Sequence, residues 1–339
     1  MIWTIIIIAA VTALASAAFV GLVRIQLLRH DILDRPNERS SHAAPTPRGG
    51  GLGLLAALLP AWVALPYLLP AADGPPATAW LIPLAALLLA GVSWLDDLAT
   101  IGPLPRLGAQ FAAALAGAVL IDGAVFQGLL PGPLETIVVA IGWVWFVNLF
   151  NFMDGIDGIS GVEAIAIGGG LMLISIAGAS TLDASHGQAL AVAGAAAGFL
   201  VWNWPPARIF LGDSGSVPLG YLLGWLLLSL AASGAWQAAA ILPLYYLADA
   251  TITLAHRAMR GERLWQAHRD HFYQAAIKRG LSHRRVSSAV ALVNLLLIAL
   301  ALLAGVAGPG SAWAWLALLG AGILVAAFLV WLAGPRVKN

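Results

Sequence analysis

The sequence lacks cysteine and carries little charge. None of its 339 residues is cysteine, and only 10% are Asp, Glu, Lys or Arg. The absence of cysteine excludes a disulfide framework, a thiolate nucleophile and thiolate-bound zinc. The apolar residues form continuous runs rather than an alternating pattern, which excludes a transmembrane β-barrel.

Long hydrophobic runs dominate the chain instead. Hydrophobic residues make up 60% of it, and many runs reach the roughly 20 residues that a helix needs to span a bilayer. These runs predict an all-α fold, a polytopic integral membrane helical bundle in which residues 1–339 form a single domain. The run at 2–23 lacks a signal-peptide cleavage pattern and is predicted to be the first span. The eleven predicted spans are 2–23, 51–70, 78–95, 107–123, 134–150, 159–179, 188–204, 215–232, 236–255, 286–307 and 312–333.

The positively charged residues lie on one side of these predicted spans. If the N-terminus is outside, all 17 Lys and Arg lie in the inner connections or within one helical turn of them. These inner segments are 24–50, 96–106, 151–158, 205–214, 256–285 and the tail after 333. The outer connections contain acids such as Asp73 and Asp183 but no Lys or Arg. The positive-inside rule therefore predicts an N-terminus outside and a cytoplasmic C-terminus.

A polar stretch from Asn148 to Gly158 separates two apolar runs near the middle of the chain. Asn148, Asn151, Asp154 and Asp157 recur every third residue, which on a helix makes one slowly drifting polar stripe. Two carboxylates and two amides beside hydrocarbon suit a divalent cation and a phosphate group. For any one of these residues alone, a helix end that faces water is an equally good interpretation.

Two further acidic motifs stand at the inner ends of predicted spans. Asp96 and Asp97 are adjacent, and like charges so close should split their affinities for protons, so that one can act as a base. Asp213 lies between Gly212 and Gly215 at the predicted start of a span, where a helix N-terminus favours phosphate. The alternatives are a topological signal for the pair, which acids serve poorly, and a simple N-cap for Asp213.

Two inner segments supply cationic and hydrogen-bond-donating side chains. Residues 34–51 combine prolines, three glycines and donors suited to a phosphate group, with an anionic lipid headgroup as the alternative ligand. Residues 256–285 contain His268 and His271, an i,i+3 pair that is a weak zinc signal without cysteine and fits a nucleotide diphosphate better. Asp249, an intramembrane acid in the ninth predicted span, is interpreted as a brace for this second segment.

In their order along the chain these motifs resemble those of the polyprenyl-phosphate N-acetylhexosamine-1-phosphate transferases. This is glycosyltransferase family 4, which also includes the phospho-N-acetylmuramoyl-pentapeptide translocase. The residues that carry the resemblance are Asp96-Asp97, Asn151 to Gly158, Asn203, Phe210 to Ser216 and His268 to His271. The resemblance implies transfer of an N-acetylhexosamine 1-phosphate from a UDP-sugar to undecaprenyl phosphate, with release of UMP. It also implies Mg²⁺ as the cofactor, with Mn²⁺ as the alternative ion, and an active site on the cytoplasmic face of the inner (plasma) membrane.

The resemblance further implies roles for individual residues. Asp213 and Asn151 are the implied metal ligands. Asp96 would contact or deprotonate the acceptor phosphate with Asp97 beside it, Asp154 and Asp157 would line the nucleotide site, and His268 and His271 would approach the diphosphate or sugar. The implied substrate-binding residues are Asn203, Arg39, His42, Thr46, Arg48, Gly212, Ser216 and Arg269. Membrane lipid is a further expected partner, a homodimer stays open, and no nucleic acid is expected.

The sequence departs from the translocase pattern at the histidines, which are spaced rather than consecutive. The segments around His42 and His271 look closer to the O-antigen-initiating branch, which uses UDP-N-acetylfucosamine, -quinovosamine or -glucosamine. This implies a role in lipopolysaccharide or another cell-envelope glycan. The alternative function is a secondary transporter with an acidic ion site. Transporters usually place such acids near the bilayer midplane, whereas the motifs here gather at one membrane edge.

Overall fold

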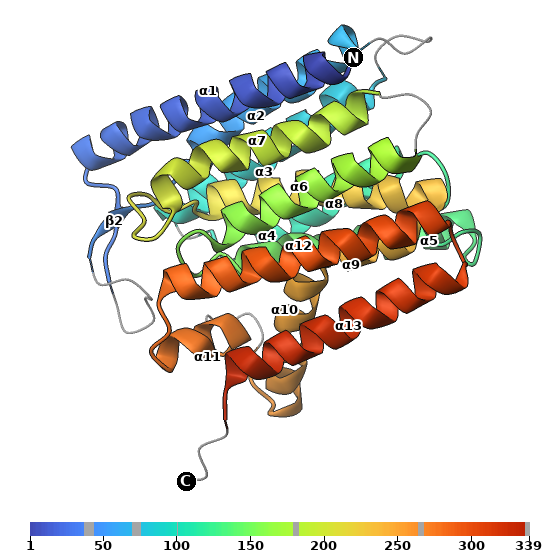
Figure 1. Ribbon diagram of the computed structural model, residues 1–339. Coiled ribbons are helices and arrows are strands. Elements are labelled where there is room, and N and C mark those ends of the chain that lie inside the picture. Colours follow the sequence, from blue (N-terminus) through green and yellow to red (C-terminus); the bar gives the residue numbers. More distant parts are fainter. Residues whose placement is uncertain (37–43, 70–75, 100, 179–182, 264–267, 336–339) are drawn as a thin grey trace.

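The protein is helical almost throughout, as the sequence predicts. The computed structural model describes residues 1–36, 44–69, 76–99, 101–178, 183–263 and 268–335 (Figure 1). The helices are α1 (Ile2–Arg29), α2 (Gly50–Leu68), α3 (Thr78–Ala99), α4 (Pro103–Ala118), α5 (Gly132–Phe152), α6 (Ile159–Gly178), α7 (Ala184–Asn203), α8 (Asp213–Leu230), η1 (Ala231–Ala235), α9 (Trp236–Ile241), α10 (Leu244–Met259), α11 (Phe272–Lys278), α12 (His283–Ala307) and α13 (Ala312–Ala333). Two short strands, β1 (Leu33–Asp34) and β2 (Thr46–Pro47), pair antiparallel.

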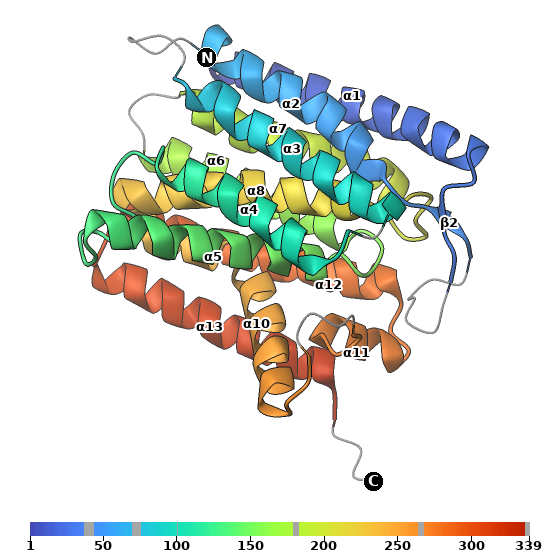
Figure 2. The same ribbon diagram turned by 180° about the vertical axis from the view of Figure 1, so that it is seen from behind.

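The long helices lie side by side with similar axis directions, while α10 runs across them (Figures 1 and 2). Helix α1 packs against α2 and α7, α7 packs against α6, and α12 packs against α6 and α13. Helices α3 and α5 both pack against α8. Almost every residue of α8 is buried, as expected for an apolar helix at the centre of a bundle.

Nine helical segments in the described part of the chain are long and apolar enough to cross a membrane. The remaining two predicted spans take other forms. The span at 107–123 corresponds to α4, which has 16 residues. The span at 236–255 is divided between α9 and α10, with Pro243 at the junction, because proline lacks the N–H and sterically blocks a continuous helix.

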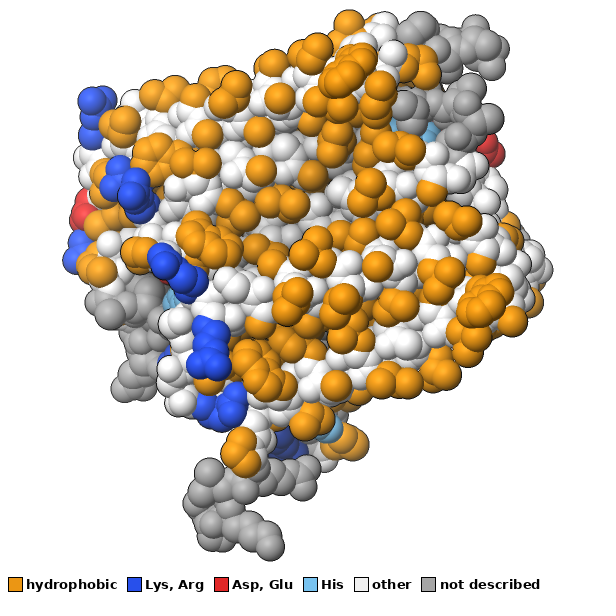
Figure 3. Space-filling view, viewed as in Figure 1, with side chains coloured by type: hydrophobic (Ala, Val, Ile, Leu, Met, Phe, Trp, Pro, Cys, Tyr) orange, Lys and Arg blue, Asp and Glu red, His pale blue; other side chains and the backbone are white. Residues whose placement is uncertain are grey.

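Charge is distributed unevenly over the surface, as the topology prediction requires. On the face shown in Figure 3, Lys and Arg side chains gather at the end of the molecule where α1 ends and α12 begins. Hydrophobic side chains cover the flanks of the helices. Helices α3 and α5 end, and α2, α4 and α8 begin, at the segments that carry the predicted inner motifs. The helix ends therefore bring these motifs together at one edge of the bundle.

Candidate active site

Three carboxylates and two arginines form one ion-pair cluster at this edge. Arg48 Nη2 lies 2.5 Å from Asp213 Oδ1 and 3.3 Å from Asp97 Oδ1. Arg106 Nη1 lies 2.6 Å from Asp96 Oδ2, and its Nη2 lies 2.9 Å from Asp213 Oδ2. The aspartates come from α3 and α8, and the arginines from the segment before α2 and from the first turn of α4. The two acidic motifs therefore meet in space, with Asp213 linking both arginines.

Local structure explains how the acids are held. Asp96 Oδ1 accepts hydrogen bonds from the backbone N–H groups of Ile101 (2.8 Å) and Gly102 (3.2 Å), at the connection from α3 to α4. Asp213 is the first residue of α8, after Gly212, whose positive φ of 75° favours glycine. A carboxylate at a helix N-terminus interacts favourably with the helix dipole. Each acid is thus fixed by its own helix end before the arginines contribute.

The donor set fits a divalent cation. Carboxylate and amide oxygens are the ligands that Mg²⁺ prefers, and Asp97 Oδ2 is buried without a hydrogen-bond partner in the described structure. An unpaired buried carboxylate oxygen is costly, and a cation would remove that cost. No group of three His, Cys, Asp or Glu side chains in the described residues could hold a metal ion alone. Asn151, water or substrate oxygens would have to complete the coordination.

The predicted polar stripe does not persist as one helical face. Helix α5 ends at Phe152, so only Asn148 and Asn151 share a helix. Asn148 Nδ2 donates to Gln110 Oε1 at 2.6 Å, inside the bundle. Asn151 Oδ1 accepts a hydrogen bond from Ser216 Oγ at 2.5 Å, in the first turn of α8. The predicted metal ligand Asn151 therefore reaches the start of α8, and Asn148 does not contribute to the cluster.

Asp154 follows α5 in the turn that leads to α6. Burial raises the pKa of Asp154 to about 7, while the charge of Arg48 lowers it and that of Asp213 raises it. Asp154 is thus within electrostatic reach of the ion-pair cluster. A carboxyl group with a pKa near neutrality can both carry and release a proton at physiological pH.

Asp157 has a mainly structural set of contacts. Its Oδ2 accepts a hydrogen bond from the Ala207 N–H at 3.0 Å, and its Oδ1 lies 3.1 Å from Nδ1 of His283. Its backbone carbonyl accepts a hydrogen bond from Ser287 Oγ at 2.7 Å. These contacts join the turn before α6 to the segment before α8 and to the start of α12. The structure thus gives Asp157 a bracing role beside the catalytic role that the sequence predicts.

Asn203 is held by backbone groups on both sides of its amide. The buried side chain accepts a hydrogen bond from the Gly158 N–H at 2.8 Å and donates to the Ile209 carbonyl at 2.9 Å. Both ends of the amide are therefore used inside the protein. The prediction that Asn203 binds substrate is not supported by this geometry, because the residue fastens two loops together.

The three consecutive glycines also have a different use from the expected one. The N–H groups of Gly49 and Gly50 donate to the Phe210 carbonyl, and that of Gly51 donates to the Leu211 carbonyl. The N–H groups of a glycine-rich segment can bind a phosphate, but here they bind the chain that precedes α8. Their lack of a side chain lets the segment that carries Arg48 lie directly against the segment that carries Asp213.

The predicted histidine pair forms a second group. The rings of His268 and His271 lie 4.9 Å apart, and Asp270 between them pairs with Arg257 at 2.6 Å. Burial, together with the neighbouring His271, lowers the pKa of His268 to about 4, so its imidazole is neutral near pH 7. Tyr273 connects this group to the turn after α5, since its hydroxyl donates to the Phe152 carbonyl at 3.1 Å.

The remaining predicted substrate-binding residues are distributed as follows. Arg39 and His42 lie outside the described residues. Thr46 is buried in β2, Gly212 caps α8, and Arg269 lies between the two histidines. Ser216 has its hydroxyl engaged by Asn151 and by the Gly212 carbonyl. Of this set, Arg48 is the one that enters the ion-pair cluster directly.

Comparison with known proteins agrees with this arrangement. Residues 79–231 match the family model described as glycosyl transferase family 4. Over this segment the chain is similar to glycosyl transferase family 4. It is 28% identical over 312 residues to the decaprenyl-phosphate N-acetylglucosaminephosphotransferase of Mycobacterium leprae, covering 78% of this chain and 75% of the relative.

Two other similar proteins bear different names. The phospho-N-acetylmuramoyl-pentapeptide-transferase of Mycolicibacterium smegmatis is 29% identical over 262 residues, covering 63% of this chain and 72% of that protein. The probable undecaprenyl-phosphate N-acetylglucosaminyl 1-phosphate transferase of Bacillus subtilis is 24% identical over 276 residues, covering 74% and 71%. The family match at 79–231 contains Asp96, Asp97, Asn151 and Asp213. It ends before the pair His268 and His271.

Arg106 is the member of the cluster that sequence reasoning missed as a site residue. It bonds two of the three acids, although in the sequence it is one arginine among many in the inner connections. Its position ten residues after Asp96, in a short connection that opens with Pro103, was the available signal. His283 was missed in the same way, because nothing in its local sequence indicates that it faces Asp157.

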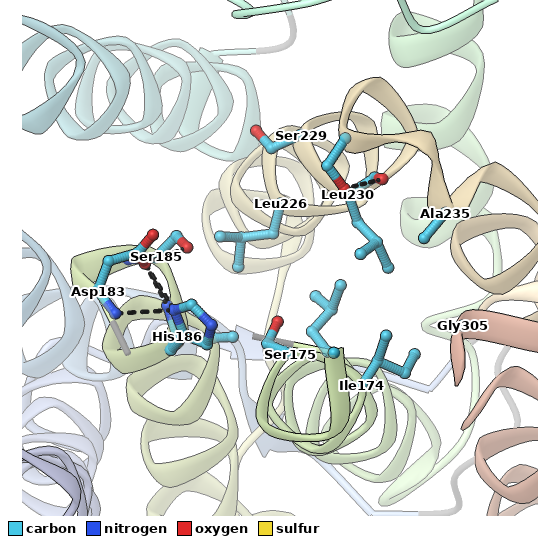
Figure 4. Close-up of a pocket in the computed structure, with 14 residues that line it drawn as sticks. Ile174, Ser175, Asp183, Ser185, His186, Leu226, Ser229, Leu230, Ala235 and Gly305 are labelled. Atoms are coloured by element: carbon cyan, nitrogen blue, oxygen red, sulfur yellow. Dashed lines mark hydrogen bonds and ion pairs between the residues drawn. The ribbon is translucent and has the colours of Figure 1, made fainter. Parts of the chain in front are cut away.

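A pocket of about 410 Å³ lies among α6, α7, α8 and η1, at the end of the bundle opposite the ion-pair cluster (Figure 4). Asp183 and His186 stand at its margin, with Nδ1 of His186 2.6 Å from Asp183 Oδ1. This pair is the capping box that opens α7, which accounts for both residues. The predicted site residues do not line this pocket.

Proposed function

We propose that this protein transfers an N-acetylhexosamine 1-phosphate from a UDP-sugar to a polyprenyl phosphate and releases UMP. The observation that carries the proposal is the cluster of Asp96, Asp97 and Asp213 with Arg48 and Arg106 at one edge of a membrane-spanning bundle. Reaction of a nucleotide diphosphate with a lipid-borne phosphate needs charge neutralisation at such an edge. The names of the relatives support the same activity.

The ion pairs suggest how substrates would be held. Arg48 and Arg106 each contact two carboxylates in the structure, and guanidinium groups also bind phosphate oxygens. An arriving diphosphate would exchange some of these carboxylate contacts for its own oxygens. Asp96 would orient or deprotonate the acceptor phosphate. Asp213, Asn151 and Asp97 would hold the divalent cation, which supplies neutralisation of diphosphate charge when it is bound.

An apolar cavity supports a polyprenyl acceptor. It has a volume of about 690 Å³, lies among α5, α8, α9, α10 and the connection before α5, and its lining includes Phe146, Leu227 and Leu247. A prenyl chain is hydrocarbon, so its isoprene units would pack against these side chains in place of lipid acyl chains, with van der Waals contact rather than release from water as the gain. The break between α9 and α10 helps to form this cavity, since Pro243 lies in its wall.

The finer assignment extends to acceptor, pathway and location. We propose undecaprenyl phosphate as the acceptor, GlcNAc, FucNAc or QuiNAc as the sugar, and lipid-linked O-antigen or another cell-envelope glycan as the product pathway. The active site would face the cytoplasm at the inner membrane. The transporter alternative has less support, because the clustered acids lie at helix ends and are bound by arginines.

The test is a reconstituted transfer reaction. Purified protein is incubated with Mg²⁺, undecaprenyl or decaprenyl phosphate and a panel of UDP-sugars, and UMP release is measured. We expect release only when both substrates are present, and we expect its loss when EDTA is added. Folded protein that releases no UMP with any sugar and acceptor would reject the proposal. The panel also identifies the sugar.

A further inference from the structure

Asp249 is a fully buried carboxylate that the proposed chemistry does not use. It lies on α10, on the same face as Tyr245 and Thr253, and this face meets the start of α11. Its relative exposure is 0%. An ionisable side chain at such a position is costly unless it has several partners. The identity of those partners indicates its purpose.

Five donors converge on this carboxylate. Oδ1 lies 3.0 Å from the Phe272 N–H nitrogen and 3.2 Å from Nδ1 of His271. Oδ2 lies 3.2 Å from the Tyr273 N–H nitrogen. The hydroxyls of Tyr245 (3.3 Å) and Thr253 (3.4 Å) complete the set. Backbone N–H groups can only donate, so Asp249 acts as the acceptor at the beginning of α11.

This arrangement determines which nitrogen of His271 carries hydrogen. A carboxylate is a stronger acceptor than an imidazole nitrogen, so Nδ1 holds the hydrogen and donates it to Asp249. The His271 side chain is also placed to accept from the backbone N–H of Gln274, in a capping box at the start of α11. The two contacts compete for the tautomer, and the carboxylate favours hydrogen on Nδ1 because a charge-assisted hydrogen bond is the stronger one. Nε2 is then left as the functional end of the ring.

His271 is only 2% exposed, so a ligand would have to reach Nε2 through a narrow opening. Nε2 is not among the buried side-chain atoms that lack a partner in the described structure. The ring is held on both sides, since it stacks on Tyr273 with centroids 5.7 Å apart and lies 4.9 Å from the ring of His268. His271 is thus a fixed imidazole with one open nitrogen.

The same carboxylate also ties the histidines to the ion-pair edge. Tyr273, whose N–H binds Asp249, donates its hydroxyl to the Phe152 carbonyl and packs against Gly155, where an added Cβ would lie 2.0 Å from the Tyr273 oxygen. Gly155 follows Asp154 directly. A displacement of Asp249 would therefore move the histidine segment and the Asp154 turn relative to each other.

We propose that Asp249 is a positioning residue, which fixes the tautomer of His271 and presents its Nε2 to the diphosphate of the nucleotide sugar. This inference rests on the proposed transferase function. Hydrogen-bond partners of metal-ligating histidines contribute about 10- to 100-fold when they are removed, and we expect a similar range for the partner of a histidine that faces a diphosphate. Asp249 would act in this way through His271, without touching substrate.

The primary test is the Asp249→Asn variant in the UMP-release assay. The side-chain N–H₂ group of the new asparagine would face a donor, either the His271 ring or a backbone N–H of α11. The asparagine therefore cannot hold His271 in its wild-type orientation. We expect kcat to fall about 10- to 100-fold, with the KM for polyprenyl phosphate unchanged. Glu135→Gln is the matched control, because that carboxylate also accepts a backbone N–H, from Phe126, in the connection before α5. The control should keep wild-type kcat.

A double-mutant cycle separates positioning from general stability. If Asp249 acts through His271, Asp249→Asn should lower kcat in the wild type and add little in a His271→Gln background. Additive losses would overturn the proposal. An active enzyme whose kcat is unaffected by Asp249→Asn would overturn it as well, and would leave the transferase function intact.

Two His271 variants keep the test decisive if Asp249→Asn fails to fold. The amide of His271→Asn can still donate to Asp249 from near the Nδ1 position, whereas His271→Gln abandons that contact. Both variants lose the buried ring and its contacts with Tyr273 and His268. We expect His271→Gln to melt lower than His271→Asn, with kcat reduced in both. Wild-type kcat in His271→Gln would overturn the proposal.

A chemical readout works even if no sugar is transferred. Diethyl pyrocarbonate labelling of His271, followed by peptide mass spectrometry, reports the exposure of Nε2. Labelling should be faster in the wild type than in folded Asp249→Asn if the carboxylate holds Nε2 outward. Equal rates would reject the positioning role without reference to the transferase activity.

Discussion

The Gly51→Ala substitution tests the close crossing of α2 and α8 beside the ion-pair cluster. A Cβ added at Gly51 would lie 2.1 Å from the Gly215 Cα and 3.0 Å from the Leu211 carbonyl oxygen. Carbon atoms in contact need about 3.5 to 4.0 Å, so the two backbones would have to separate by about 1.5 Å. The Arg48–Asp213 ion pair spans this crossing and would be displaced with it.

The expected losses follow from that separation. Misplacement of catalytic groups by about 1 Å can cost about 100-fold in rate, so we expect kcat/KM in the UMP-release assay to fall about 100-fold. Overpacking typically costs about 1 to 3 kcal/mol, which corresponds to a fall of several degrees in melting temperature.

The matched control is Gly91→Ala on α3, where an added Cβ meets no atom within 4 Å. Alanine is favoured over glycine in a helix by up to about 1 kcal/mol. The control should therefore keep wild-type activity and melt at the same or a higher temperature. A Gly51→Ala protein with wild-type activity and melting temperature would refute the close crossing.

Three further predictions concern topology, metal and pH. Ser185 and Ser282 are exposed, and the chain has no cysteine of its own. A cysteine introduced at Ser185 should react with an impermeant thiol reagent in intact cells. Labelling of a cysteine at Ser282 alone would show that the orientation is reversed. Asp213→Asn should abolish transfer in a protein that still inserts and folds, and wild-type turnover without any divalent cation would contradict its role as a metal ligand. Because burial raises the pKa of Asp154 to about 7, the folded protein keeps a proton that the unfolded chain releases above about pH 4, and stability falls as pH rises between these values. Asp154→Asn should therefore melt at least a few degrees above the wild type at pH 8 and by a smaller margin at pH 5, with equal melting curves at pH 8 as the contrary result.

Membrane spans were predictable because each is a continuous apolar run, and the nine long helical segments in the described part of the chain follow those runs. The break at Pro243 was not predictable in the same way, since the apolar residues continue through it and proline is tolerated inside other helices here, such as Pro60 in α2. Whether a proline breaks a membrane helix depends on how neighbours satisfy the freed backbone groups. That information lies in the packing and not in the local sequence.

Within the site, the acids were predictable and their partners were not. Asp96, Asp97 and Asp213 stand out because uncompensated charge beside hydrocarbon is costly. Arg106 joins two of them across more than a hundred residues of chain, and no local periodicity encodes such a contact. The sequence also did not determine the roles of individual motif residues. Asn203, for example, has the chemistry of a ligand-binding residue, but its side chain hydrogen-bonds backbone groups of two loops.

The transfer reaction can follow a direct or a covalent route at the ion-pair cluster. We expect the acceptor phosphate to attack the β-phosphorus of the UDP-sugar directly, forming the new P–O bond as the bond to UMP breaks. A phosphate monoester oxygen is already a competent nucleophile, and its second pKa is about 6 by analogy with phosphoserine, so positioning and charge neutralisation suffice.

A covalent route would need Asp96 or Asp97 as the nucleophile, with UMP leaving before lipid binds. Asp96 is poorly suited to attack, because one of its oxygens accepts two backbone N–H groups and the other is bound by Arg106. Asp97 has an oxygen without a hydrogen bond and is the stronger candidate for that route. The two routes differ in isotope exchange. With lipid phosphate rigorously removed, labelled UMP should not exchange into UDP-sugar, and exchange that disappears in Asp97→Asn would establish the covalent route in place of direct attack.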